Sequence, residues 1–138
     1  MPSEDPAVLE RQWLYAIAWS VGSLLEQQDR KRFDAFLRER DEEKRMPSFI
    51  STWSKAFSTI YQYTLTSCGQ WKEWSPLPWH CPDKIDISRD IFRLIVPTKD
   101  TVCATSLMAM MHGRRPMLFY GSHASAKTTN ILLFVGGH

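Results

Sequence analysis

Gly121-Ser122-His123-Ala124-Ser125-Ala126-Lys127-Thr128 differs by one substitution from the phosphate-binding loop pattern G-x-x-x-x-G-K-[S/T]. A short apolar run, Met117–Tyr120, precedes this stretch, and Thr129–Val135 follows it as a potential helix. Buried parallel strands have such continuous apolar runs, and a strand, a loop and a helix in this order form P-loop nucleotide-binding modules. The stretch therefore predicts a mixed α/β fold, with an N-terminal helical part and a C-terminal α/β part.

The chemistry of such a loop assigns a role to each of its parts. Backbone N–H groups and the following helix N-terminus bind phosphates, so the whole of Gly121–Thr128 is the candidate nucleotide site. Lys127 would contact the β- and γ-phosphates, and Thr128 would ligate Mg²⁺, with ATP or ADP as the cofactor. Ala126 replaces a glycine of the pattern, and a Cβ at positive φ costs roughly 1–2 kcal/mol. We therefore expect weak or structural binding, and an exposed, non-catalytic His123.

A second apolar run, Ile91–Val96, precedes the loop and is stopped by Pro97. It predicts another strand. A helix through Leu107–Met111 should follow, capped by Thr98 or Asp100 and ended by Gly113. A cap explains the polar cluster at its start more simply than a catalytic role does, and no catalytic residue is assigned.

The N-terminal half predicts a helical hairpin. Val8–Leu25 is a helix, and its apolar residues at helical spacing are Leu9, Trp13, Ile17, Val21 and Leu24. Gly22 interrupts this pattern, where a glycine usually permits close packing by a neighbour. Asp29–Arg45 is a second helix with a stripe of Phe33, Phe36 and Leu37, which is too narrow for independent folding.

The middle of the chain is less regular. Ser48–Leu65 fits a helix, although Ile60–Leu65 also alternates like a strand, and Gln70–Trp74 is a potential strand. Ser75–Asp90 contains three prolines and is expected to be a connector. The predicted division is therefore 1–74, 75–90 and 91–138.

Composition excludes several classes of protein. With 43% hydrophobic residues in 138, the chain is long and apolar enough to bury a core. A net charge of +2 argues against charge-driven binding to nucleic acid or membrane surfaces. The three cysteines have no CxxC spacing, which argues against a disulfide framework or a zinc site. No signal peptide is visible, and Trp13–Leu25 is too short to span a bilayer.

Four stretches, in this order, resemble the dynein heavy chain family. They are Tyr15-Ala16-Ile17-Ala18-Trp19-Ser20-Val21-Gly22 with Asp29-Arg30-Lys31-Arg32-Phe33, then Gly69-Gln70-Trp71-Lys72-Glu73-Trp74, Ile95-Val96-Pro97-Thr98-Lys99-Asp100-Thr101-Val102, and Arg115-Pro116-Met117-Leu118-Phe119-Tyr120-Gly121. The similarity covers roughly Leu14–Thr129 and is more specific than the loop alone. Family loops accept alanine or serine before the lysine, whereas Ala124 and Cys103 depart from the family pattern.

The resemblance implies a minus-end-directed microtubule motor with a ring of AAA+ modules. Residues 1–74 would be the helical lid of one module and 91–138 the start of the next, at the junction of the second and third modules. The implied partners are the rest of the ring and, through the parent motor, intermediate chains, light chains and microtubules. The implied location is the cytoskeleton, in the axoneme of a cilium or flagellum.

Phosphoryl transfer needs several further groups, among them an acidic Mg²⁺-positioning strand. None is recognisable between the loop and His138, so we expect a fragment of the motor that does not hydrolyse ATP by itself. The alternative is a small, non-enzymatic helical interaction module with a fortuitous loop match. Nucleotide binding distinguishes the two.

Overall fold

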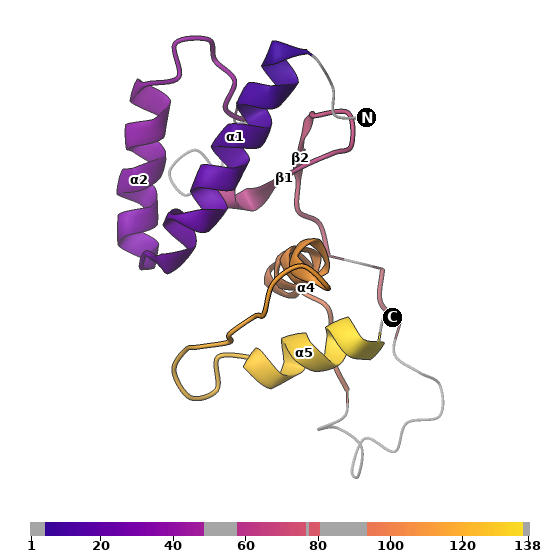
Figure 1. The fold of residues 1–138 in the computed structure, drawn as a ribbon. Helices are drawn as coiled ribbons and strands as arrows, with labels where there is room; N and C mark the ends of the chain where they lie inside the picture. The colour runs from indigo at the N-terminus through magenta and orange to yellow at the C-terminus, as the bar shows by residue number, and fades with distance from the viewer. Residues whose placement is uncertain (1–4, 49–57, 77, 81–93, 137–138) are drawn as a thin grey trace. The chain divides into compact units, whose positions relative to one another are not determined.

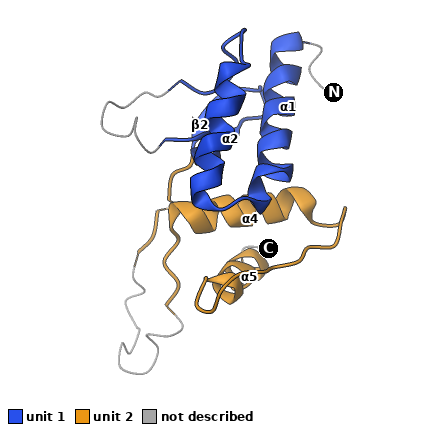
Figure 2. Cartoon of the chain, turned by 90° about the vertical axis from the view of Figure 1, so that its left-hand side faces the viewer, with its two compact units in different colours: residues 1–73 blue, residues 74–138 orange. Residues whose placement is uncertain are grey.

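A computed structural model describes residues 5–48, 58–76, 78–80 and 94–136 (Figure 1). The chain forms two compact units, Met1–Glu73 and Trp74–His138 (Figure 2). Parts of three predicted segments lie outside the described residues: 49–57 of the ambiguous segment Ser48–Leu65, 77 and 81–90 of the connector Ser75–Asp90, and 91–93 of the run Ile91–Val96.

Two helices that run in opposite directions begin the first unit (Figure 1). Helix α1 spans Pro6–Ser20; Asp5 caps it through a hydrogen bond from the backbone N–H of Ala7, 3.0 Å long. The chain then tightens into a 3-10 turn, η1, at Gly22–Leu24, and α2 spans Gln27–Glu39. The predicted helix Val8–Leu25 is therefore correct as far as Ser20, and its last residues form a different turn.

The prediction that the second helix continues to Arg45 is wrong, because α2 ends at Glu39. The carboxylate of Asp41 accepts backbone N–H bonds from Arg45, at 2.8 Å, and from Met46, at 2.7 Å. Lys44 has a left-handed φ of 53°. An aspartate that bonds nearby backbone groups in this way competes with helix, so the charged segment after Glu39 folds as a turn.

The core of the first unit consists of Leu14, Ala18, Leu37, Met46 and Ile60, with Ile17 and Phe33 packed against it. The predicted α1 face is mostly wrong. Leu9, Trp13, Val21 and Leu24 are 47%, 62%, 51% and 87% exposed. The segment Trp13–Leu25 is apolar almost all round, so its periodicity does not identify the side that faces the core.

A small antiparallel hairpin completes the first unit. A 3-10 turn, η2, at Ile60–Gln62 leads into β1, Tyr63–Leu65, which pairs with β2, Trp71–Glu73, so that Thr64 lies opposite Lys72. The turn needs Gly69, which has φ +72° and donates its N–H to the carbonyl of Thr66. The strand predicted at Gln70–Trp74 is confirmed, and the described end of the ambiguous segment is a 3-10 turn and a strand.

The second unit contains α4, Lys99–Met111, and α5, Lys127–Gly136. Thr98 and Thr101 form a reciprocal capping box at the start of α4, and Gly113 has φ +71° just beyond its end. Phe134 of α5 is buried and its ring meets that of His112 edge-on, with centroids 5.5 Å apart. Both predicted helices, and the capping role of Thr98, are confirmed.

The two predicted strands of this unit are wrong for the described residues. Neither Leu94–Val96 nor Met117–Tyr120 is a strand, and Leu118 and Tyr120 are 92% and 94% exposed. A parallel strand exists only through hydrogen bonds to neighbours, and the sheet seen within the described residues consists of β1 and β2 alone. No helix among the described residues is long and apolar enough to cross a membrane.

Candidate functional site

The candidate loop is an exposed turn that leads directly into a helix. Gly121–Ala126 is exposed throughout, and α5 begins at Lys127. The carbonyl of Ala126 accepts the N–H of Asn130 at 3.0 Å, which closes the first turn of α5. The sequence-predicted residues are therefore brought together in the order that a phosphate-binding loop requires, a turn followed by a helix N-terminus.

Two alanines of the loop adopt a backbone conformation that favours glycine. Ala124 has φ 59° and Ala126 has φ 56°. These are the two positions at which the pattern or its relatives often have glycine. The backbone therefore adopts the left-handed φ of those glycines although both residues are alanine. Each methyl group costs roughly 1–2 kcal/mol at such a φ.

Lys127 folds back over the loop. Its ammonium group donates to the carbonyl of Gly121 at 3.1 Å, to the carbonyl of Ser122 at 2.7 Å and to the hydroxyl of Ser125 at 3.0 Å. Three oxygen acceptors within one turn hold the positive charge at the centre of the loop. A phosphate oxygen that bound this ammonium would take the place of one or more of these acceptors.

The remaining loop residues have simpler surroundings. His123 and Thr128 are both exposed, and Thr128 lies in the first turn of α5. Among the described residues no group of three His, Cys, Asp or Glu side chains could hold a metal ion. Mg²⁺ ligation by Thr128 and nucleotide binding by the loop stay predictions.

In the first unit, the tryptophan, glycine and arginine of the first family motif (Trp19, Gly22 and Arg30) lie in one cluster. Arg30 donates to the carbonyl of Gly22 at 3.1 Å and to that of Ser23 at 2.9 Å, and its guanidinium lies 5.2 Å from the ring centre of Tyr61. The ring of Trp19 meets that of Tyr61 edge-on at 5.3 Å. The arginine thus satisfies carbonyl groups after the end of α1, while the aromatic pair joins α1 to η2.

Asp34 is a second structural centre, which the sequence reasoning missed. It is 5% exposed; one carboxylate oxygen accepts the N–H of Ile60 at 2.7 Å, and the other accepts Nε of Arg38 at 2.7 Å. Arg38 also donates to the carbonyl of Pro47 at 3.1 Å. The aspartate lies within a run of mixed charges, a pattern that is typical of a solvated helix face. Nothing local distinguishes it from its exposed neighbours.

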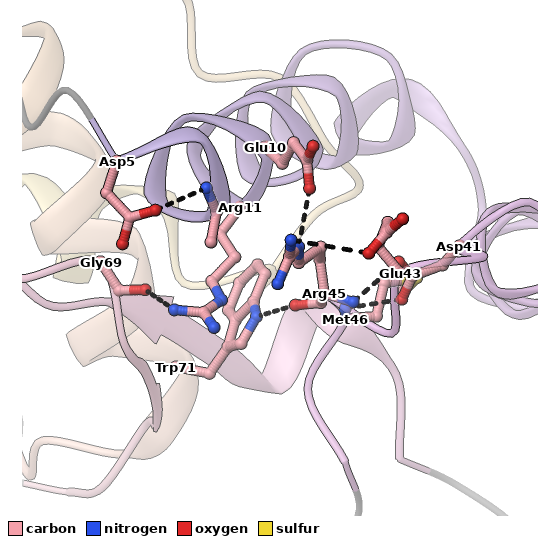
Figure 3. Close-up of polar contacts among 10 residues, drawn as sticks. Asp5, Glu10, Arg11, Asp41, Glu43, Arg45, Met46, Gly69 and Trp71 are labelled. Atoms are coloured by element: carbon pink, nitrogen blue, oxygen red, sulfur yellow. Dashed lines mark hydrogen bonds and ion pairs between the residues drawn. The ribbon is translucent and has the colours of Figure 1, made fainter.

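A third set of contacts secures the hairpin to the helices (Figure 3). The indole N–H of Trp71 donates to the carbonyl of Arg45 at 2.6 Å, and Arg11 donates to the carbonyl of Gly69 at 3.1 Å. The side chain of Arg45 pairs with Glu10 at 2.7 Å. Of the two tryptophans of the motif, Trp71 bonds the carbonyl of Arg45, and Trp74 has a buried side chain.

Comparison with known proteins places these features in a family. The dynein heavy chain AAA lid domain matches residues 2–76. The chain is 33% identical over 129 residues to mouse "Dynein axonemal heavy chain 12". The matched stretch covers 86% of this chain and 4% of that protein. It is 28% identical over 133 residues to mouse "Dynein axonemal heavy chain 5", and the match covers 95% of this chain and 3% of that protein. Human "Dynein axonemal heavy chain 8" is 24% identical over 130 residues, 92% of this chain and 3% of its own length. The chain thus spans a few per cent of the curated relatives it matches.

Proposed function

The chain belongs to the dynein heavy chain family, and from that premise we propose that it is part of an ATP-driven, minus-end-directed microtubule motor of the axoneme. Residues 1–74 act as the lid of one AAA+ module, and 91–138 begin the next module, at the junction of the second and third. The axonemal assignment is supported by the relatives, which are named as axonemal heavy chains. The rest of the ring is the immediate partner of both segments; intermediate chains, light chains and microtubules contact the parent motor.

Within this function, Gly121–Thr128 is a degenerate nucleotide-binding loop. The observation that carries the proposal is the position of Lys127 at the start of α5, with its ammonium group over the oxygens of Gly121 and Ser122. A cation, a helix N-terminus and exposed loop N–H groups together favour a phosphate anion. The loop has the polarity that ATP or ADP with Mg²⁺ needs.

The affinity is expected to be low. Lys127 gives up hydrogen bonds to loop oxygens when it turns to a phosphate, and the methyl groups of Ala124 and Ala126 crowd a ligand that approaches the backbone. Hydrolysis needs a positioned water and an acid that holds Mg²⁺ in addition to Thr128. We therefore propose binding without turnover by this chain alone.

Titration calorimetry with MgADP and MgATP tests the proposal. The 138-residue chain should bind weakly but saturably, Lys127→Ala should remove the binding, and Lys72→Ala, which removes an exposed lysine from β2, should leave it unchanged. Phosphate release should stay at background. If the chain shows no binding, or if Lys127→Ala binds as well as wild type, Gly121–Thr128 is an ordinary turn.

A further inference from the structure

We propose that the groove between α1 and α2 is a docking site for a basic amphipathic helix that belongs to the longer heavy chain outside residues 1–138. The inference depends on the family assignment and on the geometry of the first unit. It is independent of nucleotide binding by the loop, so either proposal can fail without the other.

The groove is built by two matching stripes. It has a volume of about 430 Å³. The lining residues recur at i, i+3, i+4 and i+7 along each helix: Glu10, Trp13, Leu14 and Ile17 of α1, and Phe33, Phe36 and Leu37 of α2 followed by Arg40, the residue just past its end. This spacing lines one side of each helix along the groove, and an apolar groove between two helices is the shape that the ridge of a third helix fills.

The described residues of the unit cover the apolar lining only partly. Leu14 and Leu37 form a buried floor, at 8% and 7% exposure, whereas Trp13 and Phe36 form the walls at 62% and 45%. A tryptophan and a phenylalanine beside a groove have much apolar surface to lose to a partner. Tryptophan is also the residue type most enriched among those that dominate binding energy.

Charge at one end of the groove identifies the chemistry of the occupant. The lining there contains four carboxylates, Glu10, Asp41, Glu42 and Glu43, and two guanidinium groups, Arg40 and Arg45. Both cations are already engaged. Arg45 pairs with Glu10 at 2.7 Å and with Glu43 at 3.7 Å, and Arg40 lies 3.7 Å over the ring of Phe36.

The surplus of negative charge is strengthened by the end of α2. The helix terminates at Glu39, so its C-terminal carbonyl groups add negative potential beside the four carboxylates. Within the described part of the chain, no ion pair involves Glu42, which is exposed. A docking helix therefore gains most if a Lys or Arg lies at the end that meets Glu42, with apolar residues along the rest of its face.

A second copy of the chain fits less well than a helix. A symmetric contact would set groove against groove, and two concave surfaces leave each other unfilled. The chain corresponds to 4% of the length of its mouse relative, so most of a heavy chain would be tethered to this unit. A tether raises the effective concentration of a segment, into the millimolar range where the linker is short and flexible. A segment of the same polypeptide is the favoured occupant.

Overlapping peptides of about 20 residues, long enough for several helical turns, provide the probe. They should cover the whole of mouse "Dynein axonemal heavy chain 12", and binding to the 138-residue chain is measured by fluorescence anisotropy. The peptides that bind should have apolar residues at i, i+3 or i+4, and i+7, with Lys or Arg toward one end. Trp13→Ala and Phe36→Ala should each weaken binding about tenfold or more. Leu24→Ala is the matched control, because Leu24 is 87% exposed and lies outside the groove.

Glu42→Lys tests the charge argument without removing an apolar side chain, and it should weaken basic peptides selectively. Circular dichroism of each variant verifies that the helices remain. The proposal is overturned if no heavy-chain peptide binds, if binding is indifferent to Trp13, Phe36 and Glu42, or if only peptides without basic residues bind. Self-association of the chain that Trp13→Ala abolishes would also overturn it, since a second copy would then be the occupant.

Discussion

The backbone of Gly22 lies directly against the phenolic hydroxyl of Tyr61, so closely that a Cβ at position 22 would overlap the oxygen. The glycine thus leaves room for a ring that also contacts Trp19 and lies beside Arg30. Three consecutive parts of the unit meet at this point: the end of α1, the start of α2 and the turn before β1. Substitutions at Gly22 and Tyr61 therefore test how these three parts pack together.

Gly22→Ala should lower the free energy of unfolding by about 1–3 kcal/mol, because a methyl group is forced into a packed site. Urea denaturation measures the loss. Tyr61→Phe in the same chain should recover part of it by removing the oxygen, although the ring carbon that carried it remains 2.7 Å from the added Cβ. Gly136→Ala, where nothing lies within 4 Å, should be nearly neutral. Full additivity of the two changes at 22 and 61 would contradict the contact.

The same tyrosine should make the unit sensitive to alkali. Burial raises the pKa of Tyr61 above its ordinary value of 10.0, Asp34 raises it further, and only Arg30 lowers it. The folded state therefore keeps the phenol proton to higher pH than the unfolded state does. The stability from this group is complete below pH 10 and is lost as the pH rises through the folded pKa. Urea midpoints measured from about pH 9 to about pH 11, one unit either side of the ordinary pKa, should fall less for Tyr61→Phe than for wild type.

Asp34→Ala should cost about 2–3 kcal/mol, since it leaves the buried N–H of Ile60 without its acceptor and Arg38 without its ion pair. Asp29→Ala removes an ion pair of the same helix whose side chains are 82% and 50% exposed, and it should change stability by a few tenths of a kcal/mol at most. Thermal or urea denaturation compares the two. Equal effects would mean that Asp34 acts only as a surface charge.

Ala126→Gly should stabilise the second unit by about 1 kcal/mol, because glycine adopts φ 56° without the Cβ penalty. Ala109→Gly is the matched control with the opposite sign. Ala109 is an exposed interior residue of α4, where glycine costs about 1 kcal/mol. Amide hydrogen exchange in α5 and α4 measures each change locally. A destabilising Ala126→Gly would show that the loop does not have this backbone conformation.

Cys68 should react faster with iodoacetamide than an ordinary exposed thiol. A hydrogen bond with the Thr66 hydroxyl, 3.0 Å away, lowers the pKa of Cys68 below its ordinary value of 9.0. Peptide mapping by mass spectrometry distinguishes the alkylation of Cys68 from that of the other cysteines and gives its rate at each pH. Thr66→Val should move the rate profile to higher pH, whereas Thr64→Val, on the adjacent strand, should leave it in place.

Local signals predicted the helices and their caps better than their faces and ends. The cap at Thr98 and the close approach at Gly22 were recognisable because both depend on one residue type at one position. The end of α2 was not, because it depends on how the carboxylate of Asp41 bonds two later backbone N–H groups. An acidic run looks the same to a periodicity argument whether it continues a helix or terminates one.

The parts that sequence reasoning missed are those fixed by contacts between distant residues. Asp34 is one of many charges in its helix, and only the position of Ile60 makes it a buried acceptor. Similarly, Met117–Tyr120 has the composition of a buried strand, but a strand also needs partners that composition does not supply. In the loop, the order of residues predicted the turn and the helix. It could not predict that Lys127 bonds the loop's own oxygens.

The bond from the Trp71 indole to the carbonyl of Arg45 also has a consequence for biosynthesis. Together with the bond from Ile60 to Asp34, it means that both helices are secured by residues that follow them in the chain. A ribosome releases α1 and α2 before it has made the hairpin that holds them. Since domains fold as units during synthesis, the lid should remain incompletely folded until β2 has emerged from the exit tunnel. Nascent chains arrested before and after Trp71 should therefore differ sharply in their resistance to protease.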